Sequence, residues 1–129
     1  MADIYEQHQA AFAQVSAFVI LDASGERVAT VALKFPRDGA GRLYAYVHII
    51  GVEMVRGHAN GYGYDKRSAA VAAAIAKVPA YDDARDQDST YGRRVIATRA
   101  AFQKAAPAMD SDDWTRVLER AGFRVLQAV

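Results

Sequence analysis

The chain contains no cysteine among its 129 residues. This absence excludes a disulfide framework, a thiol nucleophile and a cysteine-ligated zinc site. Long apolar runs are also missing, since no stretch approaches the length that crosses a bilayer. The opening segment, MADIYEQHQAAFAQ, is too polar to act as a signal peptide. We therefore expect a cytoplasmic protein that has no membrane partner.

An excess of charge of one sign is lacking as well. Sixteen Lys and Arg residues stand against fifteen Asp and Glu residues, for a formal net charge of +1. This balance excludes a uniformly basic nucleic-acid coat and a strongly acidic nucleic-acid mimic. The length and a hydrophobic content of 52% fit a single globular domain over residues 1–129.

Motifs for catalysis and for metal binding are absent too. The histidines His8, His48 and His58 do not cluster in the sequence, and no HExxH pair of ligands occurs. The glycines of residues 57–63 make neither a dinucleotide fingerprint, because Lys66 occupies the third glycine position, nor a P-loop. No serine sits in a nucleophile elbow. We expect no metal, no cofactor and no enzymatic activity, and we retain a small enzyme with an unrecognised site as an alternative.

The hydrophobic pattern of the first half predicts β-strands. Segments rich in β-branched and aromatic residues cover 15–22, 28–35, 43–50 and 52–59, and Gly25 provides a hairpin turn between the first two. The third and fourth segments are two strands or one long strand bent at Gly51. A last strand is expected over 123–129.

Helical periodicity predicts four helices around these strands. They are expected over 4–15, over 66–78 before Pro79, over 95–106 before Pro107, and after a cap at Asp110 or Ser111. The fold expected is therefore α+β: an antiparallel meander of four to five strands, packed by three to four helices.

A first candidate contact surface lies in the stretch GHANGYGYDKRSAAVAAAIAKV, residues 57–78. Two tyrosines, Tyr62 and Tyr64, precede Lys66 and Arg67 in the first turn of the expected helix. Cations at this position oppose the helix dipole, and a negatively charged partner would compensate them. We predict these four residues as a partner surface. The alternative is a tight glycine turn with packed tyrosines and solvated cations.

A second candidate lies on the third expected strand, where Tyr44, Tyr46 and His48 alternate with aliphatic residues and so share one face. If that face is exposed, the rings suit stacking with bases or contact with a partner protein. If helices cover it, the rings belong to the core. The sequence favours the core, and we keep the three residues as partner-binding candidates.

The order of the expected elements bears a resemblance to the double-stranded RNA-binding domain. A helix, a meander and the basic, alanine-containing start GYGYDKRSAAVAAAIAKV follow the α-β-β-β-α order of that family, whose last helix touches phosphates. This resemblance implies an RNA- or DNA-binding module that uses Lys66 and Arg67.

Over most of its length the chain resembles small orphan proteins of proteobacterial phages and mobile elements. The meander, the GYGYDK loop entering an alanine helix and the ending WTRVLERAGFRVLQAV carry this resemblance. It implies a counter-defence inhibitor of the anti-CRISPR type, which sterically blocks a host protein or ribonucleoprotein complex. The oligomeric state does not follow from it.

Overall fold

The structure, a computed structural model, describes residues 12–36, 41–61, 64–81 and 87–128. The strands are β1 (Phe12–Leu21), β2 (Arg27–Pro36), β3 (Arg42–Ile49), β4 (Val55–Asn60) and β5 (Arg124–Gln127). The helices are α2 (Tyr64–Ile75), α4 (Thr90–Ala105), the 3-10 helix η1 (Ala106–Asp110) and α5 (Trp114–Arg120).

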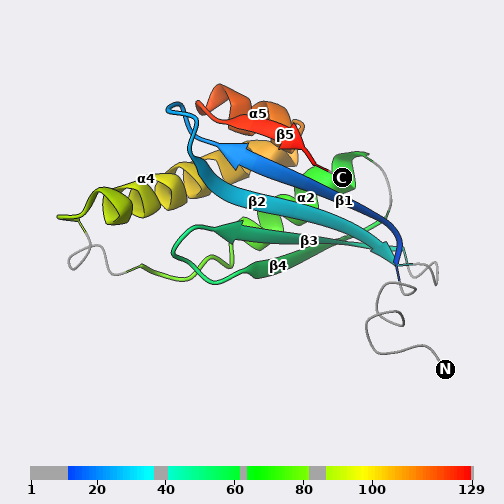
Figure 1. Cartoon of the computed structure of the whole chain (residues 1–129). Helices are drawn as coiled ribbons and strands as arrows, with labels where there is room; N and C mark the ends of the chain where they lie inside the picture. Colours follow the sequence, from blue (N-terminus) through cyan, green and yellow to red (C-terminus); the bar gives the residue numbers. More distant parts are fainter. Residues whose placement is uncertain (1–11, 37–40, 62–63, 82–86, 129) are drawn as a thin grey trace.

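All five strands belong to one antiparallel sheet in the order β4-β3-β2-β1-β5. The first four strands form a meander, and β5 returns from the end of the chain to lie beside β1 (Figure 1). The α+β fold expected from the sequence is confirmed, with five strands and three described α-helices.

The turns between strands follow from glycines that adopt positive φ. Gly25 has φ 88° in the β1–β2 turn, where the Asp22 carboxylate accepts hydrogen bonds from the backbone N–H groups of Ser24 at 2.9 Å and Glu26 at 3.0 Å. Gly51 has φ 75° in the turn after β3. The third and fourth strands are therefore two paired strands, and one bent strand is excluded.

The helix expected over residues 4–15 is wrong for residues 12–15. These residues open β1, where Phe12 pairs with Pro36 and Val15 with Lys34. Pairing with β2 satisfies the backbone of this segment, which overrides its helical spacing of apolar residues. The rest of that expected helix lies outside the described residues.

The core fills the space between one face of the sheet and the helices. Alternate residues of β3 point into it, as the burial of Leu43, Ala45, Val47 and Ile49 shows. The largest fully buried side chains of the core are Trp114, Phe102, Ile20, Leu33, Leu43, Ile49, Ile75, Met109 and Leu118. The helices supply the other half of this core, so the opposite face of the sheet lies outside it.

Helix α2 lies unusually close to β4 because both surfaces carry small residues. A Cβ atom placed on Gly57 of β4 would lie 2.2 Å from the backbone nitrogen of Ala74 and 2.5 Å from the carbonyl oxygen of Ala70. The sequence predicted this close packing of an alanine helix. Its bounds differ, because the backbone turns to i→i−3 hydrogen bonds after Ile75 and the helix ends before Val78.

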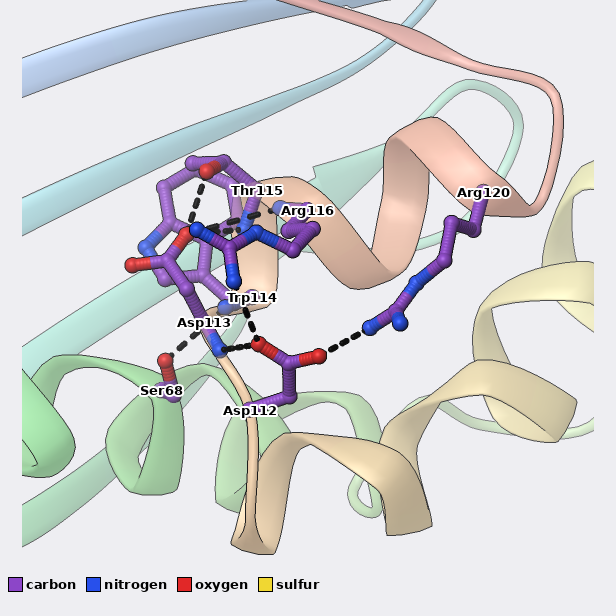
Figure 2. Close-up of polar contacts among 7 residues, drawn as sticks. All are labelled: Ser68, Asp112, Asp113, Trp114, Thr115, Arg116 and Arg120. Atoms are coloured by element: carbon purple, nitrogen blue, oxygen red, sulfur yellow. Dashed lines mark hydrogen bonds and ion pairs between the residues drawn. The ribbon is translucent and has the colours of Figure 1, made fainter.

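The last helix begins one turn later than its sequence signals indicated. The cap expected at Asp110 or Ser111 is wrong, because η1 extends through Asp110 and the Asp113 carboxylate caps α5 instead. It accepts hydrogen bonds from the backbone N–H groups of Thr115 at 2.9 Å and Arg116 at 3.4 Å (Figure 2).

Trp114 joins three elements at the start of α5. Its backbone N–H donates a 2.9 Å hydrogen bond to the Ser68 hydroxyl of α2, and both residues are buried. Its ring packs edge-on against Phe18 of β1, with centroids 4.9 Å apart. One residue thus ties α5 to α2 and to the sheet.

Asp112 joins this cap to the end of α5. Its carboxylate accepts a 2.7 Å hydrogen bond from the Asp113 N–H and pairs with Arg116 at 3.6 Å and with Arg120 (Figure 2). The hydrogen bond from Arg120, followed by that of the Asp113 N–H, lowers the pKa of Asp112 below its ordinary value of 3.8.

We predict that Gly57→Ala lowers the free energy of unfolding by about 2–3 kcal/mol, because the new methyl group meets the backbone of α2 and the helix must move. Urea denaturation measures the effect. His58→Ala, one residue further along β4 and on the other face, is the control and should change stability by less than about 1 kcal/mol. Equal stability of Gly57→Ala and the parent would show that α2 does not rest on Gly57.

We predict that Asp112→Asn destabilises the protein at neutral pH and has little effect in acid. Because the pKa of Asp112 is lowered in the folded state, its stabilisation is present above pH 3.8 and is lost as the pH falls through the folded-state pKa. Urea denaturation across a pH series measures the difference, with Asp110→Asn on η1 as the control. A difference that grows toward low pH would contradict the ion pairs described.

Candidate functional site

The face of the sheet turned away from the helices is the candidate site. In Figure 1, α2 and α4 lie behind the strands and leave the front of β2, β3 and β4 uncovered by described helices. The alternation along β3 fits this view, since Tyr44 and Tyr46 are half-buried and His48 is exposed, whereas the residues between them are buried.

Basic and aromatic side chains gather on this part of the sheet. The cross-strand pairs place Lys34 and His58 on either side of Tyr44, and Ala32 and Arg56 on either side of Tyr46. We name this surface the basic-aromatic face, and its members are Lys34, Arg42, Tyr44, Tyr46, His48, Arg56 and His58.

Each tyrosine of this face contacts a cation diagonally across the ladder. The Lys34 ammonium lies 4.7 Å from the centre of the Tyr46 ring, and the Arg56 guanidinium carbon lies 5.2 Å from the centre of the Tyr44 ring. The rings of Tyr44 and His58 are 6.2 Å apart and tilted by 52°. Cation–π contacts at such exposed sites contribute about 0.5–1 kcal/mol each, so the rings are positioned but not locked.

The electrostatics of the sheet have one sign. None of the five described strands contains Asp or Glu, whereas the strands carry Arg27, Lys34, Arg42, Arg56 and Arg124. Carboxylates instead occupy turns and the helical layer, where Asp22 pairs with Arg94 at 3.5 Å and Asp112 pairs with two arginines of α5. Acidic charge is thus kept off the strands.

The core interpretation of Tyr44, Tyr46 and His48 is wrong. The helices cover the face of Leu43 and Val47, and the aromatic residues lie on the other side. Sequence alternation identified the two faces of the strand correctly. It assigned the wrong face to the core. The large rings of the two tyrosines offer much apolar area to bury, whereas the opposite face of the strand includes a small alanine.

The structure separates the two groups of predicted site residues. Arg67 packs its guanidinium over the ring of Phe35 at 5.4 Å, on the helix-covered side of the sheet, where Phe35 is buried. The side chain of Lys66 runs beside Gly61, where an added Cβ would lie 3.2 Å from its Cγ. Tyr64 is the first residue of α2, and Tyr62 lies outside the described residues.

Sequence reasoning missed four members of the basic-aromatic face, namely Lys34, Arg42, Arg56 and His58. The signal was available in their spacing, since Arg56 and His58 alternate with small residues in the predicted fourth strand. What the sequence could not supply was the register that places them beside the tyrosines.

The described residues also contain hollows between the helices. One, of about 620 Å³, lies between α4, η1 and α5 and is lined by four alanines, by Ser111 and Val117, and by the charged residues Lys104, Asp112 and Arg120. Asp112 there serves the cap of α5, and its lowered pKa keeps it ionised. Across the described part of the chain, no group of three His, Asp or Glu side chains is placed to hold a metal ion.

Among the helices of the described residues, none combines the length and apolar character needed to cross a membrane. Comparisons with protein-family models, with curated proteins and with solved structures found no match for this chain. The basic-aromatic face is therefore the surface whose geometry and charge bear on function.

We predict that Arg67→Ala lowers the free energy of unfolding by about 1 kcal/mol, because it removes a half-buried side chain stacked on Phe35. Thermal and urea unfolding measure the loss. Lys77→Ala, an exposed cation just beyond α2, is the control and should leave stability unchanged. An unaltered stability of Arg67→Ala would contradict a packing role and favour the partner surface predicted at the start of α2.

Proposed function

We propose that this protein acts by binding rather than by catalysis, and that its contact surface is the basic-aromatic face. The observation that carries the proposal is the gathering of half-buried tyrosines and of cations on one face of the sheet, opposite the face that the core occupies. Tyrosine and arginine are enriched among the residues that dominate binding energy.

The partner that we propose is a host protein or ribonucleoprotein complex. The support for this class is the resemblance of the sequence to small proteins of phages and mobile elements, which implies a counter-defence inhibitor of the anti-CRISPR type. Occupation of a functional surface of the complex would be sufficient for inhibition. A binding module that uses Lys66 and Arg67 stays a separate prediction, since these residues belong to α2 on the other side of the sheet.

The experiment compares the parent with Tyr44→Thr/Tyr46→Thr in the capture of partners from a proteobacterial lysate. Threonine keeps a high β propensity, so the change removes the rings while favouring the strand. We expect capture to weaken by at least about tenfold. Tyr91→Thr, which removes an exposed tyrosine of α4, is the matched control and should capture as the parent does.

A second readout tests inhibition directly. Expression of the parent in a host with an active RNA-guided defence should raise the plating of a targeted phage, and the double variant should lose this effect. Equal capture by the parent and the double variant would overturn the basic-aromatic face as the contact surface. If the tyrosines are needed for capture but the parent has no effect on phage plating, the inhibitor function is overturned and the binding function stands.

A further inference from the structure

We infer that the occupant of the basic-aromatic face is a single-stranded nucleic acid, whose bases stack on Tyr44 and Tyr46 and whose phosphates contact Arg42, Lys34 and Arg56. The inference deepens the proposed function and rests on it, because it names the chemical class of the partner at the same surface.

Charge complementarity is the first reason. Four of the five described strands carry a cation and none carries a carboxylate, so an anionic chain laid across β2, β3 and β4 meets attraction at each of these strands. Phosphate contacts of this kind supply most of the sequence-independent affinity of nucleic-acid binding. A partner surface rich in Lys or Arg would be repelled.

The absence of aliphatic anchors from β2, β3 and β4 is the second reason. On the described part of β2, β3 and β4, the residues between the buried positions are Thr30, Ala32, Lys34, Arg42, Tyr44, Tyr46, His48, Arg56, His58 and Asn60. None of these is a leucine, isoleucine, valine or methionine; the aliphatic residues of the same face, half-buried Val19 and exposed Leu126, lie beside them on β1 and β5. The centres of protein–protein interfaces are apolar and depleted in charge, which this surface is not.

The spacing of the rings is the third reason. Tyr44 and Tyr46 are two residues apart on one strand and therefore about 7 Å apart, which equals two steps of the ~3.4 Å rise of bases along a strand. The flat faces of bases are hidden inside a duplex and are accessible in a single strand. The accessible parts of the two half-buried rings thus select a single strand over a duplex.

The cations now over the rings do not prevent stacking. A cation over an exposed ring strengthens its contact by about fivefold at most, whereas stacking of a base on an aromatic side chain strengthens binding by about 5- to 150-fold. A base can therefore displace Lys34 from Tyr46 and Arg56 from Tyr44. The displaced cations are then beside the phosphates.

The test is fluorescence anisotropy of the purified full chain with labelled oligouridylate and oligothymidylate of about 12 nucleotides, a length within the site sizes of small single-strand-binding domains. The two oligonucleotides distinguish RNA from DNA, and a duplex of the same length is the third probe. We expect binding of a single strand with a logarithmic salt dependence of slope roughly −2, from three phosphate contacts at about 0.7 each.

Variants separate stacking from charge. Tyr46→Thr should weaken binding by about 5- to 150-fold, and Tyr46→Phe should bind as the parent does, because stacking needs the ring and not the hydroxyl. Arg56→Gln should reduce the steepness of the salt dependence by about 0.7. Tyr91→Thr on α4 and Lys77→Ala are matched controls, and thermal unfolding checks that every variant is folded.

Three outcomes would overturn the inference: no binding of either single strand, duplex binding as tight as single-strand binding, or full binding by folded Tyr46→Thr. If the single strands do not bind while the double tyrosine variant still loses partner capture, the proposed function stands and a protein surface occupies the face. If neither oligonucleotide binding nor partner capture depends on the tyrosines, both proposals fail.

Discussion

The close approach of α2 to β4 at Gly57 is the constraint on which the rest of the structure depends. The backbone of the helix lies where a side chain of β4 would otherwise be, so α2 sits directly on the sheet. The buried residue paired with Gly57 is Ala45, whose small side chain also lets the helix come close to the neighbouring strand β3. This contact fixes which face of the sheet the helices cover, and thereby which face stays open.

With α2 packed on the sheet, a short series of contacts positions α5. Ser68 of α2 accepts a hydrogen bond from the N–H of Trp114, and the Trp114 ring packs on Phe18 of β1, on the helix-covered face of the sheet. The acidic residues at the start of α5 are used in capping and in pairing with Arg116 and Arg120. These carboxylates therefore lie in the helical layer, whereas the five described strands together carry cations and no carboxylate.

The sequence predicted the strands, the turn at Gly25 and the alanine helix because each depends on local pattern. It failed at Phe12 and Val15, whose helical spacing was overridden by pairing with β2. It also failed at the cap of α5, because the expected cap residues Asp110 and Ser111 form the end of η1. For the site, alternation separated Tyr44 and Tyr46 from Val47, but the register that adds Arg56 and Lys34 is a property of the tertiary structure.

The strand order also has a consequence for biosynthesis. The partner of β1 on its outer edge is β5, which is synthesised after the other four described strands and the helices between them, so that edge has no strand to pair with until then. β1 reads FAQVSAFVIL and contains no charged residue, a composition that favours association between unfinished chains. Synthesis of the four residues of β5 is thus the step that allows this edge to close.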